Sequence, residues 1–351
     1  MRKKIKKSED IAGEVKEAIE GEPVVDTGSN DVSFDKVIST GSTLLDLAIS
    51  GKRIRGGGIP AGIIVEFFGP SGVGKTALLA EACASAQAKG GEAYFQDPEA
   101  RLDMEYSRIY GMDLKEKGKY GRPDTVMEFF DNIRSWKPSN PEAINVVAGD
   151  SLTALSTKME LEDKDEYGMR RAKEFSQELR KTCRMIRNNN WIILCSNQIR
   201  GGAGGEFVPG GHGIPFYSSV RIRVGKPASG SKIKSNITLE GSRKSLEKII
   251  GIKSTCIVKK NTVDDPYREA NIYIIFGYGI DDIRGNLMFI KEVTGNTKYD
   301  CVNKEIGFID KAIAYIEEND LEKELREKTI DLWLEIEDKF RTKVARKQKR
   351  R

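Results

Sequence analysis

Hydrophobic and polar positions alternate along this chain in blocks, and the blocks predict its fold class. Continuous apolar runs of strand length occur at residues 63–68, 93–96, 144–148 and 191–195. Amphipathic helical patterns lie between them, as at 75–89 and 170–187. Strands that are apolar on both sides and alternate with helices are typical of a parallel sheet covered on both faces. We therefore expect an α/β protein with a mostly parallel central sheet.

The pattern changes toward both ends of the chain. Strand-like runs at 220–224, 255–259 and 271–276 precede a helical region that begins near residue 286. Ahead of the sheet, Ile11, Val15 and Ile19 repeat every four residues behind a possible cap, Ser8. We expect an N-terminal helical arm at 1–36, a core at 37–285, a small α/β C-terminal domain at 286–340 and a basic tail at 341–351. A frayed terminus is the alternative for the arm.

Composition excludes several classes of protein. The 351 residues include one histidine, His212, so a two-histidine metal site is impossible within one chain, and a hydrolase triad would have to use that residue. Five scattered cysteines, with no CxxC pair, indicate neither a zinc site nor a disulfide framework. No run approaches the ~20 apolar residues of a membrane span, and no apolar stretch follows the basic N-terminus. A cytoplasmic protein without a membrane partner is expected. The net charge of +5 decides nothing by itself.

One motif carries chemistry on its own. Residues 69–76 fit the phosphate-loop pattern G-x-x-x-x-G-K-[ST], after an apolar strand and at the start of a helix. Its glycines let backbone N–H groups surround phosphates, Lys75 would reach the β- and γ-phosphates, and the Thr76 hydroxyl would hold Mg²⁺. ATP and Mg²⁺ are therefore the expected cofactors; a chance glycine-rich turn is the alternative. The expected binding residues are Gly69, Pro70, Ser71, Gly72, Val73, Gly74, Lys75, Thr76 and Ala77.

Two further carboxylates are candidates for this site. Asp150 ends an apolar strand, where an acid would lie beside the phosphate loop and support the metal. A helix cap is the alternative for Asp150. Glu99 follows another strand end and could polarise a water toward the γ-phosphate, although Asp97 competes for that role.

Several separated segments resemble the RecA-type DNA recombinases. They are ISTGSTLLDLAI, GPSGVGKT, AYFQDPEARLDMEYSRIYGMD, RPDT, VVAGDSLTAL, SQELRK, NQIR, GGHGIPFYSSVR and VKKNTVDDPYREANIYIIFGYGI, in family order from about residue 38 to 285. The resemblance implies a DNA-dependent ATPase that forms a helical homo-oligomeric filament on single-stranded DNA and pairs it with a homologous duplex. It also implies single-strand-binding and loader proteins as possible partners.

The resemblance assigns roles by position. Glu99 would be the catalytic carboxylate, Asp103 and Tyr106 would contact adenine, and Gln198 would sense the γ-phosphate and pass the signal to the second DNA-binding loop. Phe216 would lie at the subunit interface, and Lys260 would reach the ATP of the adjacent subunit. The expected DNA contacts are Arg170, Arg171, Lys173, Ser176, Arg180, Arg200, Phe207, Gly210, Gly211 and His212. The alternatives are a solvated helix face for the arginines, a turn residue for His212 and a core residue for Phe216.

The sequence also departs from the family. Thr262 stands where bacterial members usually carry a second lysine, with Lys259 as a possible substitute. Loop one (159–169) is acidic and loop two (200–211) is short, and extra residues occur at 52–58 and 228–250. The tail is basic, which suits either duplex capture or solubility.

A strand-exchange recombinase is the favoured interpretation of the sequence. A RecA-like mediator or regulator without strand exchange is the first alternative, and a ring-forming helicase motor is the second.

Overall fold

The computed structural model describes residues 36–116, 118–161, 169–202, 205–207, 213–227, 230–240 and 244–340. The predicted arm and basic tail therefore lie outside the described residues, apart from Lys36. Gly210, Gly211 and His212 lie outside them as well. For four other predicted site residues, only the backbone is described: Tyr106, Arg170, Arg200 and Phe207.

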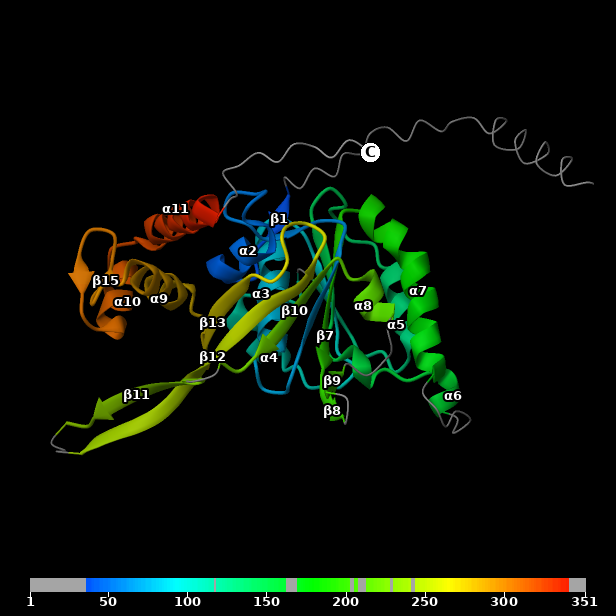
Figure 1. Ribbon diagram of the computed structural model, residues 1–351. Coiled ribbons are helices and arrows are strands. Elements are labelled where there is room, and N and C mark those ends of the chain that lie inside the picture. The colour runs from blue at the N-terminus through cyan, green and yellow to red at the C-terminus, as the bar shows by residue number, and fades with distance from the viewer. Residues whose placement is uncertain are drawn as a thin grey trace, which may run out of the picture. The chain divides into compact units, whose positions relative to one another are not determined.

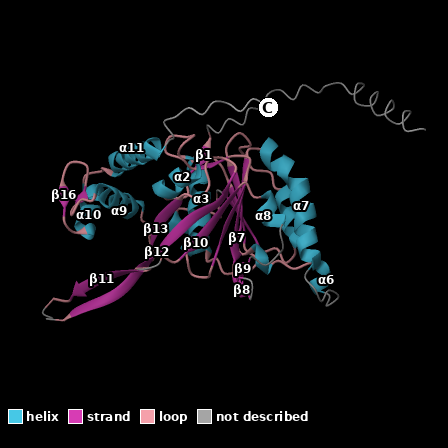
Figure 2. Cartoon of the chain, in the orientation of Figure 1, coloured by secondary structure: helices cyan, strands magenta, loops and turns pink. Residues whose placement is uncertain are grey.

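A central sheet organises the described chain (Figures 1 and 2). Its order is β14-β13-β12-β10-β3-β7-β6-β4-β5, with β11 paired to β12 outside this path. Neighbours from β10 to β5 are parallel, whereas β11, β12, β13 and β14 pair antiparallel. The predicted fold class is confirmed. The strands of this sheet are β3 (Ile64–Gly69), β4 (Ala93–Gln96), β5 (Gly118–Gly121), β6 (Asn145–Gly149), β7 (Trp191–Gln198), β10 (Val220–Gly225), β11 (Lys232–Thr238), β12 (Ser245–Asn261), β13 (Glu269–Ile275) and β14 (Gly279–Ile280).

Helices cover both faces of this sheet. On one face, α5 and α7 bury Phe129, Phe130 and Phe175 against Val147 and Ile193 of the parallel strands. Helix α3 contacts β3, β4, β6 and β7 but contributes nothing to that cluster, which puts it on the other face. The helices of the core are α2 (Thr43–Ser50), α3 (Lys75–Ala88), α4 (Met104–Ser107), α5 (Val126–Ser135), α6 (Lys158–Leu161), α7 (Met169–Asn188) and α8 (Gly213–Tyr217). Within the described ranges, no helix is both long and apolar enough to cross a membrane.

Strand β12 is much longer than the sequence pattern predicts. Alternation predicts a strand at 255–259, but β12 spans Ser245–Asn261 and forms a ribbon with β11 at its N-terminal end. The residues of β12 from Ser245 to Ile249 are exposed, so no buried face imposes an apolar alternation there. This explains why the pattern missed the ribbon.

Three helices follow the sheet and enclose a small core of their own. They are α9 (Asp282–Thr294), α10 (Ile309–Glu318) and α11 (Glu322–Phe340), with a short pair of strands, β15 (Tyr299–Asp300) and β16 (Glu305–Ile306). Leu287, Ile290, Ala312, Ile316 and Leu325 form the centre of this core. The domain boundary expected after residue 285 falls inside α9, which Asp281 caps by accepting the N–H of Arg284 at 2.9 Å.

The extra residues at 52–58 hold α11 against the main body. Arg55 pairs with Glu327 at 2.7 Å and with Asp331 at 2.9 Å. From the other side of this loop, Lys52 pairs with Asp265 at 2.7 Å. The insertion therefore links α11 to the loop that follows β12 through exposed ion pairs. A second short strand pair, β1 (Val37–Ile38) with β2 (Ile59–Pro60), lies on either side of α2 and this insertion in sequence.

Candidate nucleotide-binding site

The phosphate loop lies between β3 and α3, as the sequence predicts. Gly72 and Gly74 have φ values of 71° and 90°, in the left-handed region that glycine adopts without strain. Gly74 is also the residue that caps α3, and it has no side chain to cover the first helical N–H groups. A phosphate can therefore approach the positive end of the helix dipole.

Lys75 is buried at the base of the loop. Its Nζ donates to the carbonyls of Gly69 at 3.1 Å and Pro70 at 2.7 Å. Burial lowers the pKa of Lys75, while the negative charges of Asp150 and Glu99 oppose that change. The two carboxylates thus help to keep a cation where phosphate charge would arrive.

Thr76 and Asp150 are brought together from segments 74 residues apart. The Thr76 hydroxyl donates to Asp150 Oδ2 at 2.7 Å, and the Ser196 hydroxyl donates to Asp150 Oδ1. Burial raises the pKa of Asp150, and both hydroxyl donors act in the opposite direction. Hydroxyl and carboxylate oxygens beside a phosphate loop fit Mg²⁺, which prefers a few protein oxygens together with phosphate oxygens and water. Asp150 follows β6 as expected; the sequence did not reveal that Ser196 would hold it.

The structure separates the two competing acids that follow β4. Asp97 is buried and accepts from the N–H of Leu102 at 2.7 Å and the hydroxyl of Tyr120 at 3.0 Å. Glu99 lines the cavity beside Lys75 and Thr76, with Arg101 Nη1 3.2 Å from its Oε2. Asp97 therefore shapes the turn, and Glu99 is the acid that faces the cavity. Arg101 was not predicted from the sequence.

A cavity of about 410 Å³ joins these residues, a volume within the usual range for small-molecule sites. Predicted residues that line it include Asp103 and Gln198. The backbone of Tyr106 lies in α4, one residue after Glu105, whose N–H donates to Asp103 Oδ1 at 2.8 Å. Lining residues that were not predicted from the sequence include Tyr110, Ile252, Ile274 and Phe276. The last three come from β12 and the β13 region, and no local pattern could show that these strands reach the phosphate loop.

Gln198 connects the cavity to the predicted second loop. It ends β7, where it lies beside Gly69 in the register of the sheet. The next residue, Ile199, donates its N–H to the Gly69 carbonyl at 3.2 Å. Two short antiparallel strands follow at once, β8 (Arg200–Gly202) and β9 (Gly205–Phe207). The backbone of Gln198 therefore continues within two residues into this hairpin.

The predicted DNA contacts on α7 differ in their surroundings. Lys173 and Arg180 are exposed, and Arg180 Nε lies 3.4 Å from the Tyr217 hydroxyl. Arg171 is half-buried and donates to the carbonyls of Thr153 at 3.4 Å and Leu155 at 3.3 Å. The Ser176 hydroxyl donates back to the Ala172 carbonyl at 2.9 Å. Arg171 and Ser176 are thus engaged within the subunit, while Lys173 and Arg180 face solvent.

Phe216 and Lys260 lie together, away from the nucleotide cavity of their own subunit. Phe216 is 74% exposed, so the alternative of an ordinary core phenylalanine is wrong. Lys260 Nζ donates to the carbonyls of Pro215 at 3.0 Å and Phe216 at 2.8 Å. Burial and the neighbouring Arg221 lower the pKa of Lys260. Neither residue lines the 410 Å³ cavity.

A cluster of polar side chains, formed by Glu66, Arg221 and Asn197, lies near Lys260. Glu66 of β3 is fully buried, accepts from Asn197 Nδ2 at 2.7 Å and pairs with Arg221 of β10. The Arg221 guanidinium also stacks on Phe68, 4.5 Å from the ring centroid. This group joins Asn197, the neighbour of Gln198, to the surroundings of Lys260 and Phe216.

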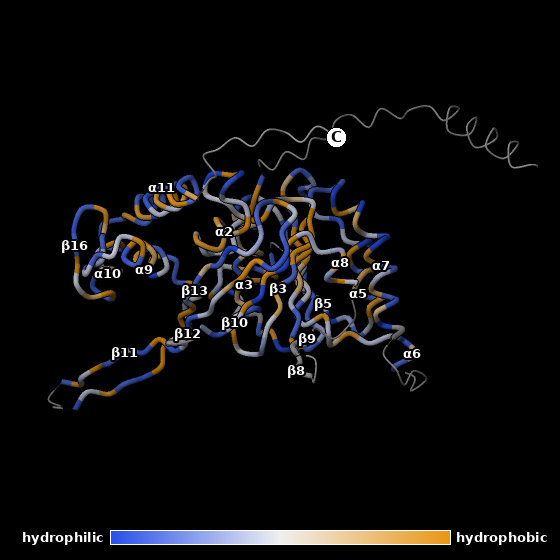
Figure 3. Tube along the Cα trace, in the orientation of Figure 1, coloured by the Kyte–Doolittle hydropathy of each residue, from blue (hydrophilic) through white to orange (hydrophobic). Residues whose placement is uncertain are grey.

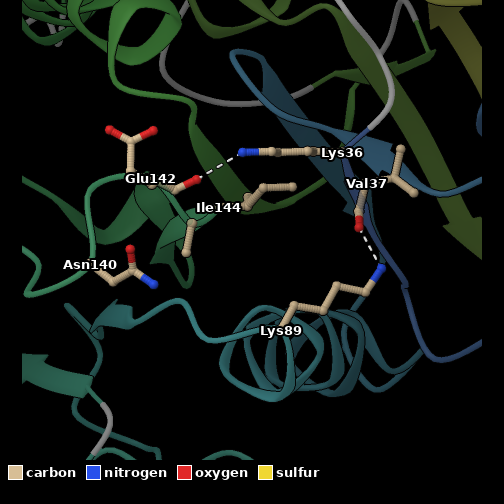
Figure 4. Close-up of a pocket in the computed structure, with 7 residues that line it drawn as sticks. Lys36, Val37, Lys89, Asn140, Glu142 and Ile144 are labelled. Atoms are coloured by element: carbon tan, nitrogen blue, oxygen red, sulfur yellow. Dashed lines mark hydrogen bonds between the residues drawn. The ribbon is translucent and has the colours of Figure 1, made fainter.

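A second cavity, of about 440 Å³, lies near the start of the described chain (Figure 4). There Lys36 Nζ donates to the Glu142 carbonyl at 3.1 Å, and Lys89 Nζ donates to the Val37 carbonyl at 2.6 Å. Both lysines fasten strand β1 to the core. The lysines that line this cavity are thus engaged in holding β1 in place.

Comparison with known proteins decides the family. A family model described as the RecA N-terminal domain matches residues 9–281. The protein RecA of Thermus aquaticus is 37% identical over 254 residues, which cover 70% of this chain and 69% of that protein. The protein RecA of Thermus thermophilus is 35% identical over the same length and shares of both chains. This chain belongs to the RecA family. RecA-family proteins bind ATP and DNA in recombination and repair, and the phosphate loop, Thr76 and Asp150 described above fit that chemistry.

Proposed function

We propose that this RecA-family chain is an ATP-dependent recombinase that polymerises on single-stranded DNA and exchanges strands with a homologous duplex. The observation that carries the proposal is the position of Gln198. Its side chain lines the nucleotide cavity, and its backbone continues directly into the β8–β9 hairpin. A protein that only stores or hydrolyses ATP has no need of this connection.

Nucleotide binding would use the residues already at the cavity. The glycines of the phosphate loop and the N-terminus of α3 would hold the phosphates, and Lys75 would turn from the Gly69 and Pro70 carbonyls toward them. Thr76 would bind Mg²⁺ directly, with Asp150 in its outer shell through the hydrogen bond to Thr76. When bound, Mg²⁺ neutralises charge on the phosphate oxygens. Asp103 and Tyr106 would contact the adenine.

Hydrolysis would use Glu99 as the base. Its carboxylate would accept a proton from water as the water oxygen attacks the γ-phosphorus and the bond to the β-phosphate oxygen breaks. Gln198 would contact the γ-phosphate in the ATP state and lose that contact after hydrolysis. The hairpin that follows it would then change its hold on DNA, which couples ATP to filament state.

DNA and the adjacent subunit would meet other surfaces. Loop one, the exposed face of α7 and loop two would contact the phosphodiester backbone, with Lys173 and Arg180 supplying charge. Phe216 would pack on a neighbouring subunit, and Lys260 would approach that neighbour's ATP, as an arginine finger does. Single-strand-binding and loader proteins would act on the same filament.

A D-loop assay with ATP, single-stranded DNA and a homologous supercoiled duplex tests the proposal. We expect D-loops that require ATP and homology, together with ATP hydrolysis that single-stranded DNA stimulates. Filaments on single-stranded DNA in electron micrographs are expected alongside. A protein that shows DNA-stimulated hydrolysis but no filaments would point instead to a helicase motor.

A recombination mediator or regulator without strand exchange is the second candidate. It is favoured by one observation: Lys260 is held by carbonyls of its own subunit, and Thr262 stands where a second lysine is usual. ATP binding without DNA-stimulated hydrolysis and without D-loops would support this candidate.

A further inference from the structure

The ribbon formed by β11 and β12 extends beyond the central sheet (Figure 1). Pairing runs from Lys232 opposite Ile252 to Thr238 opposite Ser245, whereas β13 pairs with β12 only from Gly251 onward. Residues 245–250 of β12 therefore have β11 as their only strand neighbour among the described residues. A two-stranded ribbon with exposed faces is marginal by itself, so a partner would stabilise it.

The ribbon and its base carry a net positive charge. Residues 226–253 contain seven lysines or arginines and two glutamates, a net charge of +5. The whole chain has 58 basic and 53 acidic residues, which leaves 51 of each outside this segment. The modest net charge is thus unevenly distributed: this segment and the tail at 341–351, which has seven basic residues and no acidic one, are basic, and the rest of the chain is net acidic. A concentration of this kind indicates a polyanionic partner.

Both faces of the ribbon combine basic and aliphatic side chains: Ile249 lies opposite Lys234, and Lys248 shares the face of Ile237 and Leu246. Lys232 and Lys234 are exposed on one face, where Lys234 pairs with Glu247 at 2.8 Å. On the other face, Ile237 lies opposite Leu246, and their exposed fractions are 57% and 43%. Figure 3 shows hydrophobic positions along both strands of the ribbon. Basic side chains therefore accompany exposed aliphatic ones on a narrow, projecting element.

We propose that the β11–β12 ribbon is an arm that binds duplex DNA. The proposal rests on the recombinase function, for which a duplex is one substrate. A two-stranded ribbon has the width that the major groove admits. Aliphatic side chains such as Ile237 and Leu246 are also of the kind that wedge between base steps in the minor groove. The lysines would bind phosphates on either side.

Single-stranded DNA fits this element less well. Proteins that bind single strands combine positive charge with aromatic side chains on which bases stack. Residues 226–253 contain no Phe, Tyr or Trp. Charge without a stacking surface favours a duplex, whose bases remain stacked on one another.

The position of the ribbon suits a second DNA contact. Strand β12 runs antiparallel to β10, and β10 runs parallel to β3. The ribbon therefore leaves the sheet at the edge where β3 enters the phosphate loop and β7 enters the β8–β9 hairpin. Ile252, at the base of the ribbon, lines the nucleotide cavity.

Charge removal tests the arm on the full-length protein. We compare the wild type with K232Q/K234Q/K248Q by fluorescence anisotropy, using a 30-base-pair duplex and a 30-nucleotide oligo-dT over a range of NaCl concentrations. We expect duplex affinity to fall about tenfold or more, and the salt slope to become shallower by up to about 3, since each phosphate contact contributes ~0.9. Affinity for oligo-dT should change much less.

Two further variants make the test specific. K115Q/K119Q/K137Q removes the same number of charges away from the ribbon and should leave the duplex salt slope unchanged. Replacing residues 234–250 with Asn-Gly joins Ile233 to Gly251, which face each other in the ribbon, through a two-residue turn. This deletion should remove the duplex preference but keep DNA-stimulated ATP hydrolysis.

The outcomes distinguish a failure of the duplex-binding proposal from a failure of the proposed recombinase function. Unchanged duplex affinity and salt slope in both ribbon variants would contradict the proposal that the ribbon binds duplex DNA. Loss of filament assembly with normal duplex binding would overturn it too and identify the ribbon as a contact between copies of the chain. A wild type that makes no D-loops, yet loses duplex binding with the ribbon, would refute the recombinase function and leave the arm standing.

Discussion

Asp97 and Glu99 are separated by one residue but have different surroundings. Oδ2 of Asp97 accepts from a backbone N–H and a tyrosine hydroxyl, whereas Glu99 faces the nucleotide cavity. Ala100 between Glu99 and Arg101 has a φ of 52°, which turns the chain sharply after the acid. The backbone, rather than the identity of the acid, thus determines which of the two can meet a water molecule.

Replacing Glu99 tests its role as a base. We expect Glu99→Gln to bind ATP normally and to hydrolyse it about 10²–10⁴-fold more slowly, because the amide cannot accept the proton. Equilibrium dialysis with ATP and a phosphate-release assay measure the two quantities. Asp97→Asn serves as the comparison and should lower stability more than chemistry. Unchanged turnover in Glu99→Gln would remove Glu99 from the reaction.

Glu81 is a titrating group on the phosphate-loop helix. Burial raises its pKa to about 7, with Asp282 acting in the same direction and the Ile280 N–H, at 3.0 Å, opposing it. The folded state therefore holds this proton more tightly than the unfolded state, and this contribution to stability falls as pH rises from about 5 to about 8. We expect Glu81→Gln to gain stability relative to the wild type over that interval, by about 1–3 kcal/mol at pH 8. Urea unfolding at several pH values measures the difference, and a constant difference would contradict the assignment.

At the scale of elements, two of the arginines of α7 differ in their contacts. Arg171 reaches back to the carbonyls of Thr153 and Leu155, while Arg180 is exposed beside Tyr217. One arginine therefore holds the helix to the segment before loop one, and the other is available to a ligand.

Alanine substitutions should distinguish the two arginines. We expect Arg180→Ala to weaken single-stranded DNA binding and reduce the salt slope by ~0.7, the contribution of one phosphate contact on a single strand, without loss of stability. Arg171→Ala should instead lower the free energy of unfolding by about 1–2 kcal/mol, because two carbonyls lose their donor. Anisotropy titrations and urea unfolding measure these effects. A purely destabilising Arg180→Ala would favour the solvated-face interpretation.

Elements with a buried face were predictable from sequence, and exposed ones were not. Strand β6 is buried at all five positions, and its apolar run indicated it to within one residue. The phosphate loop, Thr76 and Asp150 could be found because glycine geometry and strand-end acids are local signals. Ile274 and Phe276 could not, since their place in the cavity depends on which strand lies beside which. The ribbon was missed because exposed strands follow no apolar period.

At the scale of the whole molecule, Phe216 lies on the surface that we propose contacts another subunit. Its ring is 74% exposed and lies edge-on to Tyr217 at 5.1 Å, while its carbonyl holds Lys260. The buried Glu66–Arg221 pair and Asn197 connect this surface to the end of β7. This polar group therefore lies between the proposed interface and the strand end that carries Gln198.

Truncating Phe216 should affect assembly and not folding. We expect Phe216→Ala to change the free energy of unfolding by less than about 0.5 kcal/mol, as is usual for an exposed position. ATP-dependent filament formation on single-stranded DNA should fall strongly, as measured by light scattering and electron microscopy. Normal assembly in this variant would place the interface elsewhere.

The middle of strand β12 is where the ribbon leaves the central sheet. At its junction with the ribbon, Gly251 lies so close to the Ile274 carbonyl that a Cβ there would sit 2.3 Å from the oxygen, and the pairing with β11 shifts register beside it. An irregularity in the pairing therefore lies where the ribbon leaves the sheet, and a bulge of this kind bends its strand. In subunits that repeat along a helical axis, these ribbons would project at regular intervals along a spiral. A duplex bound to successive ribbons would be held at a constant pitch relative to the bound nucleotides.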